Sequence, residues 1–229
     1  MLCITWSAAR GHVFLFDLEA GERVSSWTMP ATADEAASKA VSHWSDAAGV
    51  AIDEHFHLYV ADPHNHVVRH FSAFGRHLGD LGRPPEGDGD ALRDRPGTLH
   101  RPQGVALCGG ELLVAQGDVP RRRGVQRFAL GGAVLRPLAS GGDPDAKFAA
   151  PQAIACDDRE ILVADTGNGR IQRFRHDGSF VAAVPCGRSG EFARPFALTS
   201  LGGGAMLALD RGDRREAFVI DRAGVRRTA

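Results

Sequence analysis

The sequence predicts an all-β fold, a β-propeller built from four-stranded antiparallel blades, and three observations lead to it. The first is the segment ILVADTGNGRIQRF at residues 161–174, in which two short apolar runs flank a polar turn. The second is that this pattern recurs along the chain at a spacing of about 46 to 57 residues. The third is that short strand-like runs alternate with turn signals and show no helical periodicity, which excludes a parallel α/β arrangement. A period of this length with four short strands is typical of a propeller blade.

Five units carry the pattern, so we expect a single propeller domain over residues 1–229. The copy at residues 58–71, LYVADPHNHVVRHF, is close to the one at 161–174, whereas the copy at 2–16 is the most divergent. One four-stranded sheet cannot bury both of its faces, and radial packing of the units solves this. We expect five blades, or a six-bladed ring if an N-terminal piece is missing. The units cover about residues 1–45, 46–100, 101–149, 150–193 and 194–229.

Most units begin with a short apolar strand that follows a proline. The segments are RPQGVAL at residues 101–107, APQAIAC at 150–156 and RPFALTS at 194–200, and the second unit has GVAID at 49–53. A two-stranded hairpin comes next, then a glycine-containing turn and one further strand. Residues 82–100 are dense in Gly, Pro and Asp and predict a long surface loop.

The residues between the two hairpin strands suit tight turns. In the segment DTGN, the side chain of Asp165 can accept backbone N–H groups, while Gly167 and Asn168 tolerate a positive φ. The segment DPHN, from Asp62 to Asn65, has the same chemistry. The turns therefore support the hairpin assignment.

The unit PQAIACDDREILVADTGNGRIQRFRHDGSFVAAVPCG resembles an NHL repeat, and so does the unit that runs from Gly49 through residues 65–67. Both share the family pattern of Pro-x-Gly-Val, LyVAD, Asn followed by His or Gly, and a Phe-x-x-x-Gly turn. The resemblance covers residues 46–229 and is strongest in the second and fourth units. It implies a propeller, which in this family usually closes with six blades. The similar branches are bacterial NHL-repeat proteins of unassigned function.

Composition excludes several classes of protein. The net charge of -1 gives no overall bias toward nucleic acid or an acidic membrane. No apolar stretch approaches the roughly 20 residues that span a bilayer, and no signal peptide is visible, so we expect a soluble, cytoplasmic protein without a membrane partner. The cysteines show no CxxC pair, so we expect neither a zinc ribbon nor a disulfide framework, and Cys156 reads as a small core residue. The four cysteines are Cys3, Cys108, Cys156 and Cys186.

Basic or potentially basic residues recur in the loop between the hairpin strands of every unit. In a propeller these loops share one face with the blade-to-blade loops, so the recurring cations would focus a positive potential there. The alternative is a structural role, in which Arg170 pairs with Asp165 inside its turn. Arg215 and Asp210 would form the same pair in the last unit. The run 121–123 departs from the repeat and is the best sign of a functional surface. The candidate ligand-binding residues are Arg10, His12, His64, Asn65, His66, Arg121, Arg122, Arg123, Arg170, Arg211, Arg214 and Arg215.

Histidines raise the question of a metal site. His64 and His66 stand two residues apart and could supply two ligands. Together with His43 or His100 from blade-to-blade loops they would form a three-histidine zinc site with an open position. The peptide-amidating lyases, which are NHL-like propellers, use such a site. Against it, the later units have no histidine in these loops, and the only tyrosine, Tyr59, lies inside an apolar strand. We expect no cofactor, with zinc or calcium at these histidines as the weaker alternative.

These observations favour a non-catalytic binding or scaffold module, whose basic loop face meets a protein, a peptide or a small anionic ligand. Two alternatives stay open. One is an RNA-binding NHL domain, in which phosphate contacts would dominate because the loops lack aromatic residues for base stacking. The other is a metal-dependent lyase or hydrolase that resembles peptide-amidating lyase. No GxSxG motif points to serine hydrolase chemistry.

Overall fold

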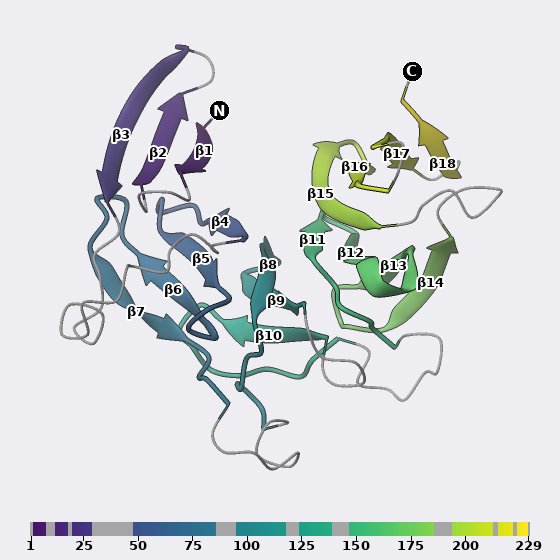
Figure 1. The fold of residues 1–229 in the computed structure, drawn as a ribbon, viewed down its shortest axis with the longest axis horizontal. Helices are drawn as coiled ribbons and strands as arrows, with labels where there is room; N and C mark the ends of the chain where they lie inside the picture. The colour runs from purple at the N-terminus through teal and green to yellow at the C-terminus, as the bar shows by residue number, and fades with distance from the viewer. Residues whose placement is uncertain are drawn as a thin grey trace.

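A computed structural model gives the fold of the chain. It describes residues 2–7, 12–17, 20–28, 48–85, 95–117, 124–138, 147–185, 194–212, 215–221 and 224–228. Within these ranges it contains eighteen β-strands in five antiparallel sheets and a single turn of 3-10 helix at Thr166–Asn168 (Figure 1). We refer to the sheets as blades 1 to 5 in chain order. The all-β propeller class expected from the sequence is confirmed.

The strands of each blade follow one another in sequence and pair with their neighbours. Blade 1 consists of β1 Leu2–Ser7, β2 His12–Asp17 and β3 Glu22–Thr28. Blade 2 consists of β4 Val50–Ile52, β5 Leu58–Asp62, β6 Val67–Phe71 and β7 His77–Leu81. Blade 3 consists of β8 Pro102–Cys108, β9 Glu111–Gln116 and β10 Val125–Ala129. Blade 4 consists of β11 Ala153–Cys156, β12 Glu160–Asp165, β13 Arg170–Arg175 and β14 Phe180–Pro185. Blade 5 consists of β15 Pro195–Gly202, β16 Ala205–Asp210, β17 Ala217–Asp221 and β18 Gly224–Arg227.

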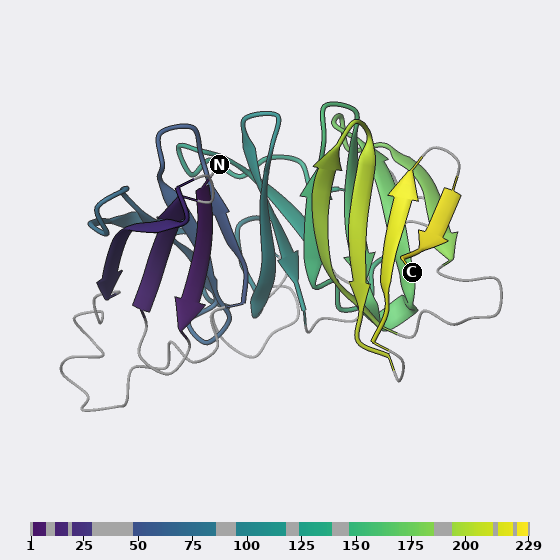
Figure 2. The same ribbon diagram turned by 90° about the horizontal axis from the view of Figure 1, so that it is seen from above.

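The blades stand side by side around an arc whose two ends, blade 1 and blade 5, are apart (Figure 1). Strands β4, β8, β11 and β15 lie next to one another along the inner side. Seen from above, the strands run between two opposite faces of the arc (Figure 2). We call upper the face where β5, β9, β12 and β16 end, which lies at the bottom of Figure 2 and faces the viewer in Figure 1, and lower the opposite face. The described parts of the loops that follow these four strands, and of the connections between blades, therefore lie on the upper face.

Two blades have three strands in the described part of the chain, where four were predicted. Blade 1 starts directly with its hairpin. In blade 3 the outer segment makes only an isolated bridge, between Phe128 and Val134. Leu135 and Leu138 still donate backbone hydrogen bonds to blade 3, at 2.8 and 3.3 Å. Pro137 stands between them and has no N–H group to continue the ladder, which explains why no regular strand forms there.

Apolar clusters fill the spaces between blades 2 and 3, between blades 3 and 4, and between blades 4 and 5. Leu112 and Leu113 are adjacent in β9 and face opposite sides of the sheet, yet both have 0% exposure. Leu112 packs into the cluster shared with blade 2, and Leu113 into the cluster shared with blade 4. A third cluster joins Ile171 of blade 4 to Phe218 of blade 5. A blade covered on both sides therefore needs a continuous apolar run, as the sequence LLVA shows.

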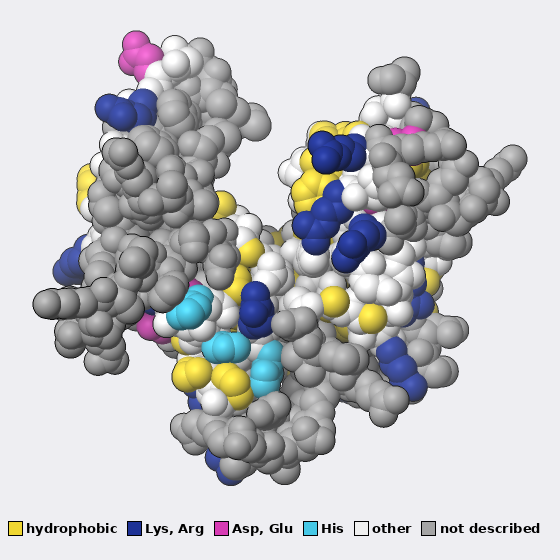
Figure 3. Space-filling model, in the orientation of Figure 1, with side chains coloured by type: hydrophobic (Ala, Val, Ile, Leu, Met, Phe, Trp, Pro, Cys, Tyr) yellow, Lys and Arg dark blue, Asp and Glu magenta, His cyan; other side chains and the backbone are white. Residues whose placement is uncertain are grey.

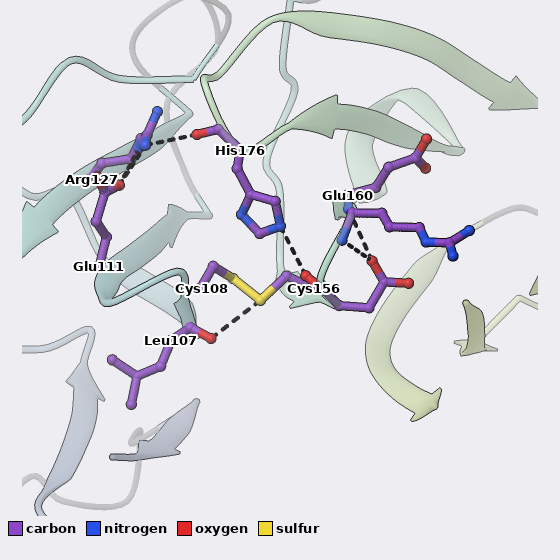
Figure 4. Close-up of a disulfide and its surroundings, with 9 residues drawn as sticks. Leu107, Cys108, Glu111, Arg127, Cys156, Glu160 and His176 are labelled. Atoms are coloured by element: carbon purple, nitrogen blue, oxygen red, sulfur yellow. Dashed lines mark hydrogen bonds and ion pairs between the residues drawn. A yellow bond between two sulfur atoms is a disulfide. The ribbon is translucent and has the colours of Figure 1, made fainter. Parts of the chain in front are cut away.

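A disulfide joins Cys108 at the end of β8 to Cys156 at the end of β11, with a Cα–Cα distance of 5.9 Å (Figure 4). The expectation that the cysteines form no disulfide, and that Cys156 is only a core residue, is therefore wrong. The two cysteines are 48 residues apart, close to one repeat, so they occupy matching positions on neighbouring inner strands. Sequence spacing alone does not reveal this match, because it depends on which strands are adjacent.

Among the described residues, no helix has the length and apolar character to cross a membrane.

Candidate functional site on the upper face

The carboxylate that ends the first hairpin strand is buried and organises the upper end of its blade. In blade 4, Asp165 has 0% exposure. Its Oδ2 accepts hydrogen bonds from Arg170 Nε at 2.8 Å, from Gln172 Nε2 at 2.8 Å and from Asn168 Nδ2 at 2.7 Å. Its Oδ1 accepts the backbone N–H of Ala149 at 2.6 Å. The predicted pairing of Arg170 with Asp165 is confirmed, and this arginine is chiefly structural.

Blade 2 has an equivalent buried aspartate, Asp62, which a different arginine contacts. Asp62 Oδ2 accepts hydrogen bonds from Arg69 Nε at 2.7 Å and from Asn65 Nδ2 at 2.8 Å. Asn65, which the sequence placed among the ligand-binding candidates, therefore closes the turn. Arg69 was not predicted. It lies opposite Val60 as Gln172 lies opposite Val163, so comparison of the two hairpins in register is the signal that could have found it.

Blade 3 replaces the charged pair by two buried amides. Gln116 Oε1 accepts the backbone N–H of His100 at 2.6 Å. Gln126 accepts the N–H of Gly97 at 2.9 Å and donates to the Thr98 carbonyl at 2.5 Å. These bonds hold the end of the connection from blade 2, and hence place His100 and the residue that follows it on the upper face.

Two of the histidine candidates meet on this face. The rings of His66 and His100 lie 6.3 Å apart, edge to face. His66 has a positive φ of 61°, and its Nδ1 accepts the backbone N–H of Arg101 at 3.1 Å. Burial lowers the pKa of His66, and the nearby positive charges of His100, Arg101 and His64 lower it further. The imidazole is therefore favoured in its neutral form, which can accept a hydrogen bond or bind a ligand through nitrogen.

The three-histidine metal site is not assembled in the described part of the chain. No group of three or more His, Cys, Asp or Glu side chains there has an arrangement that could hold a metal ion. His43 lies outside the described residues, as do Arg10, Arg121, Arg122, Arg123 and Arg214. His12 begins β2, and only its backbone is described.

Arg211 is the best-positioned exposed cation of blade 5. Its Nη2 donates to Gln152 Oε1 of blade 4 at 2.7 Å, and its guanidinium lies 5.4 Å from the centre of the Phe196 ring. Gln152 and Phe196 were not predicted as site residues. Each is the third residue of the segment that opens its blade, APQ or RPF, and Gln103 has this position in RPQ. This recurring position next to the inner side of the arc is the signal that could have identified them.

Arg215 lies in the loop between β16 and β17, where it has a positive φ of 50° and donates its backbone N–H to the Gly212 carbonyl at 3.1 Å. The Oδ1 of Asp210 accepts two backbone N–H groups, from Arg194 at 2.9 Å and from Gly212 at 2.8 Å. The carboxylate thus fixes the loop through its backbone, and the side chain of Arg215 is exposed.

In the part of the upper face that the structure describes, the exposed charged side chains are mostly cations. The carboxylates of Asp62, Asp165 and Asp210 are at most 4% exposed and are engaged inside the blades. Histidine side chains and side chains of the Lys/Arg class gather toward the inner side of the arc on this face (Figure 3). Because these three carboxylates are buried and the cations are exposed, the described residues present positive charge there although the whole chain is nearly neutral. The exposed cations in the described loops and connections of this face include Arg83, Arg95, Arg101, Lys147, Arg194, Arg211 and Arg215.

Comparison with known proteins adds evidence on the fold. No protein-family model matches the chain, and no curated protein matches it in sequence. Among solved structures, virginiamycin B lyase from Staphylococcus aureus is similar, with a TM-score of 0.64 and 12% identity over 98% of this chain and 68% of that chain. A streptogramin B lyase gives a TM-score of 0.66 and 14% identity over 98% of this chain and 67% of that chain.

A Bacteroides caccae protein of unknown function is similar as well, with a TM-score of 0.59 and 16% identity over 100% of this chain and 71% of that chain. The chain thus spans about two thirds of the length of these neighbours. At such low identities the likeness establishes the fold alone. It places this chain among β-propeller structures.

Proposed function

We propose that this chain is a binding module whose upper face takes an anionic segment of a protein or peptide, or a small anionic ligand. One observation carries the proposal: Arg211 is exposed, yet its guanidinium is held between Gln152 and Phe196. A guanidinium fixed in this way loses less side-chain entropy when it binds a carboxylate or phosphate. Arg194 and Arg215, from the same blade, add exposed positive charge beside it.

The proposal can be tested with a fluorescein-labelled decaglutamate peptide and fluorescence anisotropy. We expect Arg211→Glu to weaken binding about tenfold, since one well-placed charge contact is worth about 1.4 kcal/mol. Arg76→Glu is the matched control, because Arg76 is an exposed arginine in a turn on the lower face. Equal weakening by both variants would mean that only net charge matters, and the proposed site would be wrong. Stronger competition by a single-stranded RNA of equal charge would favour the RNA-binding alternative.

A second candidate function is lyase chemistry that uses the His66–His100 pair. Its support is the pair itself on the upper face, together with the fold similarity to lyases. A further similar structure is a catalytically inactive His-to-Ala variant of the S. aureus virginiamycin B lyase with quinupristin. Incubation with quinupristin, with and without added zinc or calcium, tests this candidate by chromatography of the intact compound. Activity that survives His66→Ala and His100→Ala would contradict a role for the pair.

We also propose that the repeats are of the NHL type, on the motifs of blades 2 and 4. For the location of the folded chain, the Cys108–Cys156 disulfide favours an oxidising compartment, because such bonds are rare in the reducing cytosol. The cytoplasmic location expected from the sequence is therefore the weaker choice. A thiol-alkylation shift assay on freshly lysed cells distinguishes the two, since only a reduced pair reacts.

A further inference from the structure

Histidines gather around Asp53 and Tyr59 at the lower end of blade 2. His57 Nδ1 lies 3.1 Å from Asp53 Oδ2, and the Tyr59 hydroxyl donates to the same oxygen at 3.4 Å. The ring of His70 stacks on Tyr59 at 4.4 Å and meets the edge of His57 at 5.2 Å. Burial, together with the negative charge of Asp53 and its hydrogen bond, raises the pKa of Tyr59 to about 12, so the hydroxyl stays protonated.

The matching positions in blades 3 and 4 hold an arginine and a glutamate. Arg127 Nε donates to Glu111 at 2.7 Å, and Arg173 Nε donates to Glu160 at 2.7 Å. In register, His70 of β6 corresponds to these arginines. His57 precedes the first residue of β5 and corresponds to the glutamates. Blade 2 has thus replaced an arginine–glutamate ion pair by two histidine rings in contact.

The surroundings of His70 do not favour a charge. Its Nε2 atom is buried and has no hydrogen-bond partner among the residues that the structure describes. Burial lowers the pKa of His70, the charges of His57 and His77 lower it further, and only Asp53 opposes them. The other titratable neighbours are already engaged, because His77 contacts Asp80 at 2.7 Å. Blade 3 adds apolar side chains to the cluster around Tyr59 and no ionisable group that shifts His70.

We propose that the His57–His70 contact is an acid-sensitive latch at the lower end of blade 2. In the closed state a neutral His70 ring stacks on Tyr59 and contacts the ring of His57, which Asp53 holds. When the pH falls, a proton on His70 places a charge in this contact, where burial and the charge of His57 oppose it. The stack then opens and the strands β5 and β6 loosen locally.

The direction of the pH effect follows from linkage. A histidine whose pKa is lowered in the closed state binds protons more weakly there than in the open state. The closed state is therefore fully favoured above the ordinary histidine pKa of about 6.5, and it loses this advantage as the pH falls below that value. An arginine paired with a glutamate carries no such dependence between pH 5 and 8, so blades 3 and 4 provide an internal reference.

The direct test follows the histidine Cε1–H signals by NMR between pH 4.5 and 8.5. We expect His70 to titrate below 6.5 in the natural chain. In the variant His57→Glu the partner becomes an anion, and the His70 pKa should rise above 6.5. An unchanged His70 pKa in this variant would overturn the proposal, and so would a value at or above 6.5 in the natural chain.

The opening itself is measured by amide hydrogen exchange of β5 and β6 at pH 5.5 and 7.5, corrected for intrinsic rates. We expect the acid to speed exchange several-fold in the natural chain, since a single histidine with an ordinary pKa of about 6.5 in the open state allows at most about tenfold over this range. The double variant His57→Glu, His70→Arg grafts the blade 4 pair, and His70→Phe keeps the stack without a titrating group. Both should abolish the acid effect in blade 2. An acid effect that persists in either folded variant would show that the latch lies elsewhere.

Discussion

Asp62 and Arg69 form an ion pair of 2.7 Å, with the two side chains only 4% and 3% exposed. Such a pair is not strong evidence for stability as a whole, because both charges lose their hydration. Removal of one partner of this pair, however, is expected to destabilise the fold. Arg69→Met would leave a buried carboxylate without its cation. We expect a loss of about 3–5 kcal/mol in the free energy of unfolding, measured by urea denaturation.

Arg69→Gln is the matched comparison, because Gln172 contacts the equivalent carboxylate of blade 4. The glutamine still donates a hydrogen bond to Asp62, so this variant should lose clearly less stability than Arg69→Met. Equal losses in the two variants would mean that the size of the arginine side chain, and not the satisfaction of Asp62, is what the site requires.

The disulfide gives a second prediction. Cys108 and Cys156 close a loop of 48 residues, for which the loop-entropy estimate is about 4 kcal/mol. The double variant Cys108→Ala, Cys156→Ala should therefore lose about 2–4 kcal/mol of unfolding free energy. Dithiothreitol should lower the midpoint of the natural chain to that of the variant and leave the variant unchanged. An effect of the reductant on the variant would assign the sensitivity to another cysteine.

The repeat pattern made much of the fold predictable. Hairpin strands such as β5 and β12 were found because neighbouring blades impose an apolar run, and a tight polar turn must follow it. The pairing of Arg170 with Asp165 was predictable for the same reason, since both residues belong to one hairpin. These features depend on contacts that are local in sequence.

Contacts between blades were not predictable in the same way. The disulfide, and the contact of Arg211 with Gln152, join residues whose proximity depends on which inner strands are neighbours. The missing outer strand of blade 3 had a local cause in Pro137, but the regular repeat length concealed it. For the upper face, the sequence identified the cations by type, whereas only the structure separates the structural Arg170 from the exposed Arg211.

Close packing of the inner strands gives a third prediction. A Cβ atom on Gly104 would lie 2.5 Å from the Gln152 carbonyl oxygen and 3.0 Å from the Ala153 Cα atom. These are backbone atoms of β11 and the residue before it, so Gly104→Ala must push two blades apart. We expect a loss of about 1–3 kcal/mol in unfolding free energy. Gly131→Ala is the control, because a Cβ there meets nothing within 4 Å, and a similar loss in both would refute the packing explanation.

His66 gives the last prediction, on the pH dependence of stability. Its pKa is lowered in the folded chain, by burial first and then by His100 and Arg101. The unfolded chain therefore binds the proton more tightly, and the stabilisation is present above about pH 6.5 and is lost as the pH falls below it. Asparagine tolerates the positive φ of this position and does not titrate, so His66→Asn should flatten the decline in unfolding free energy between pH 7 and 5. Measurement in the His70→Phe background removes the contribution of His70 at the other end of the same blade. A slope that His66→Asn leaves unchanged there would show that the proton is taken up elsewhere.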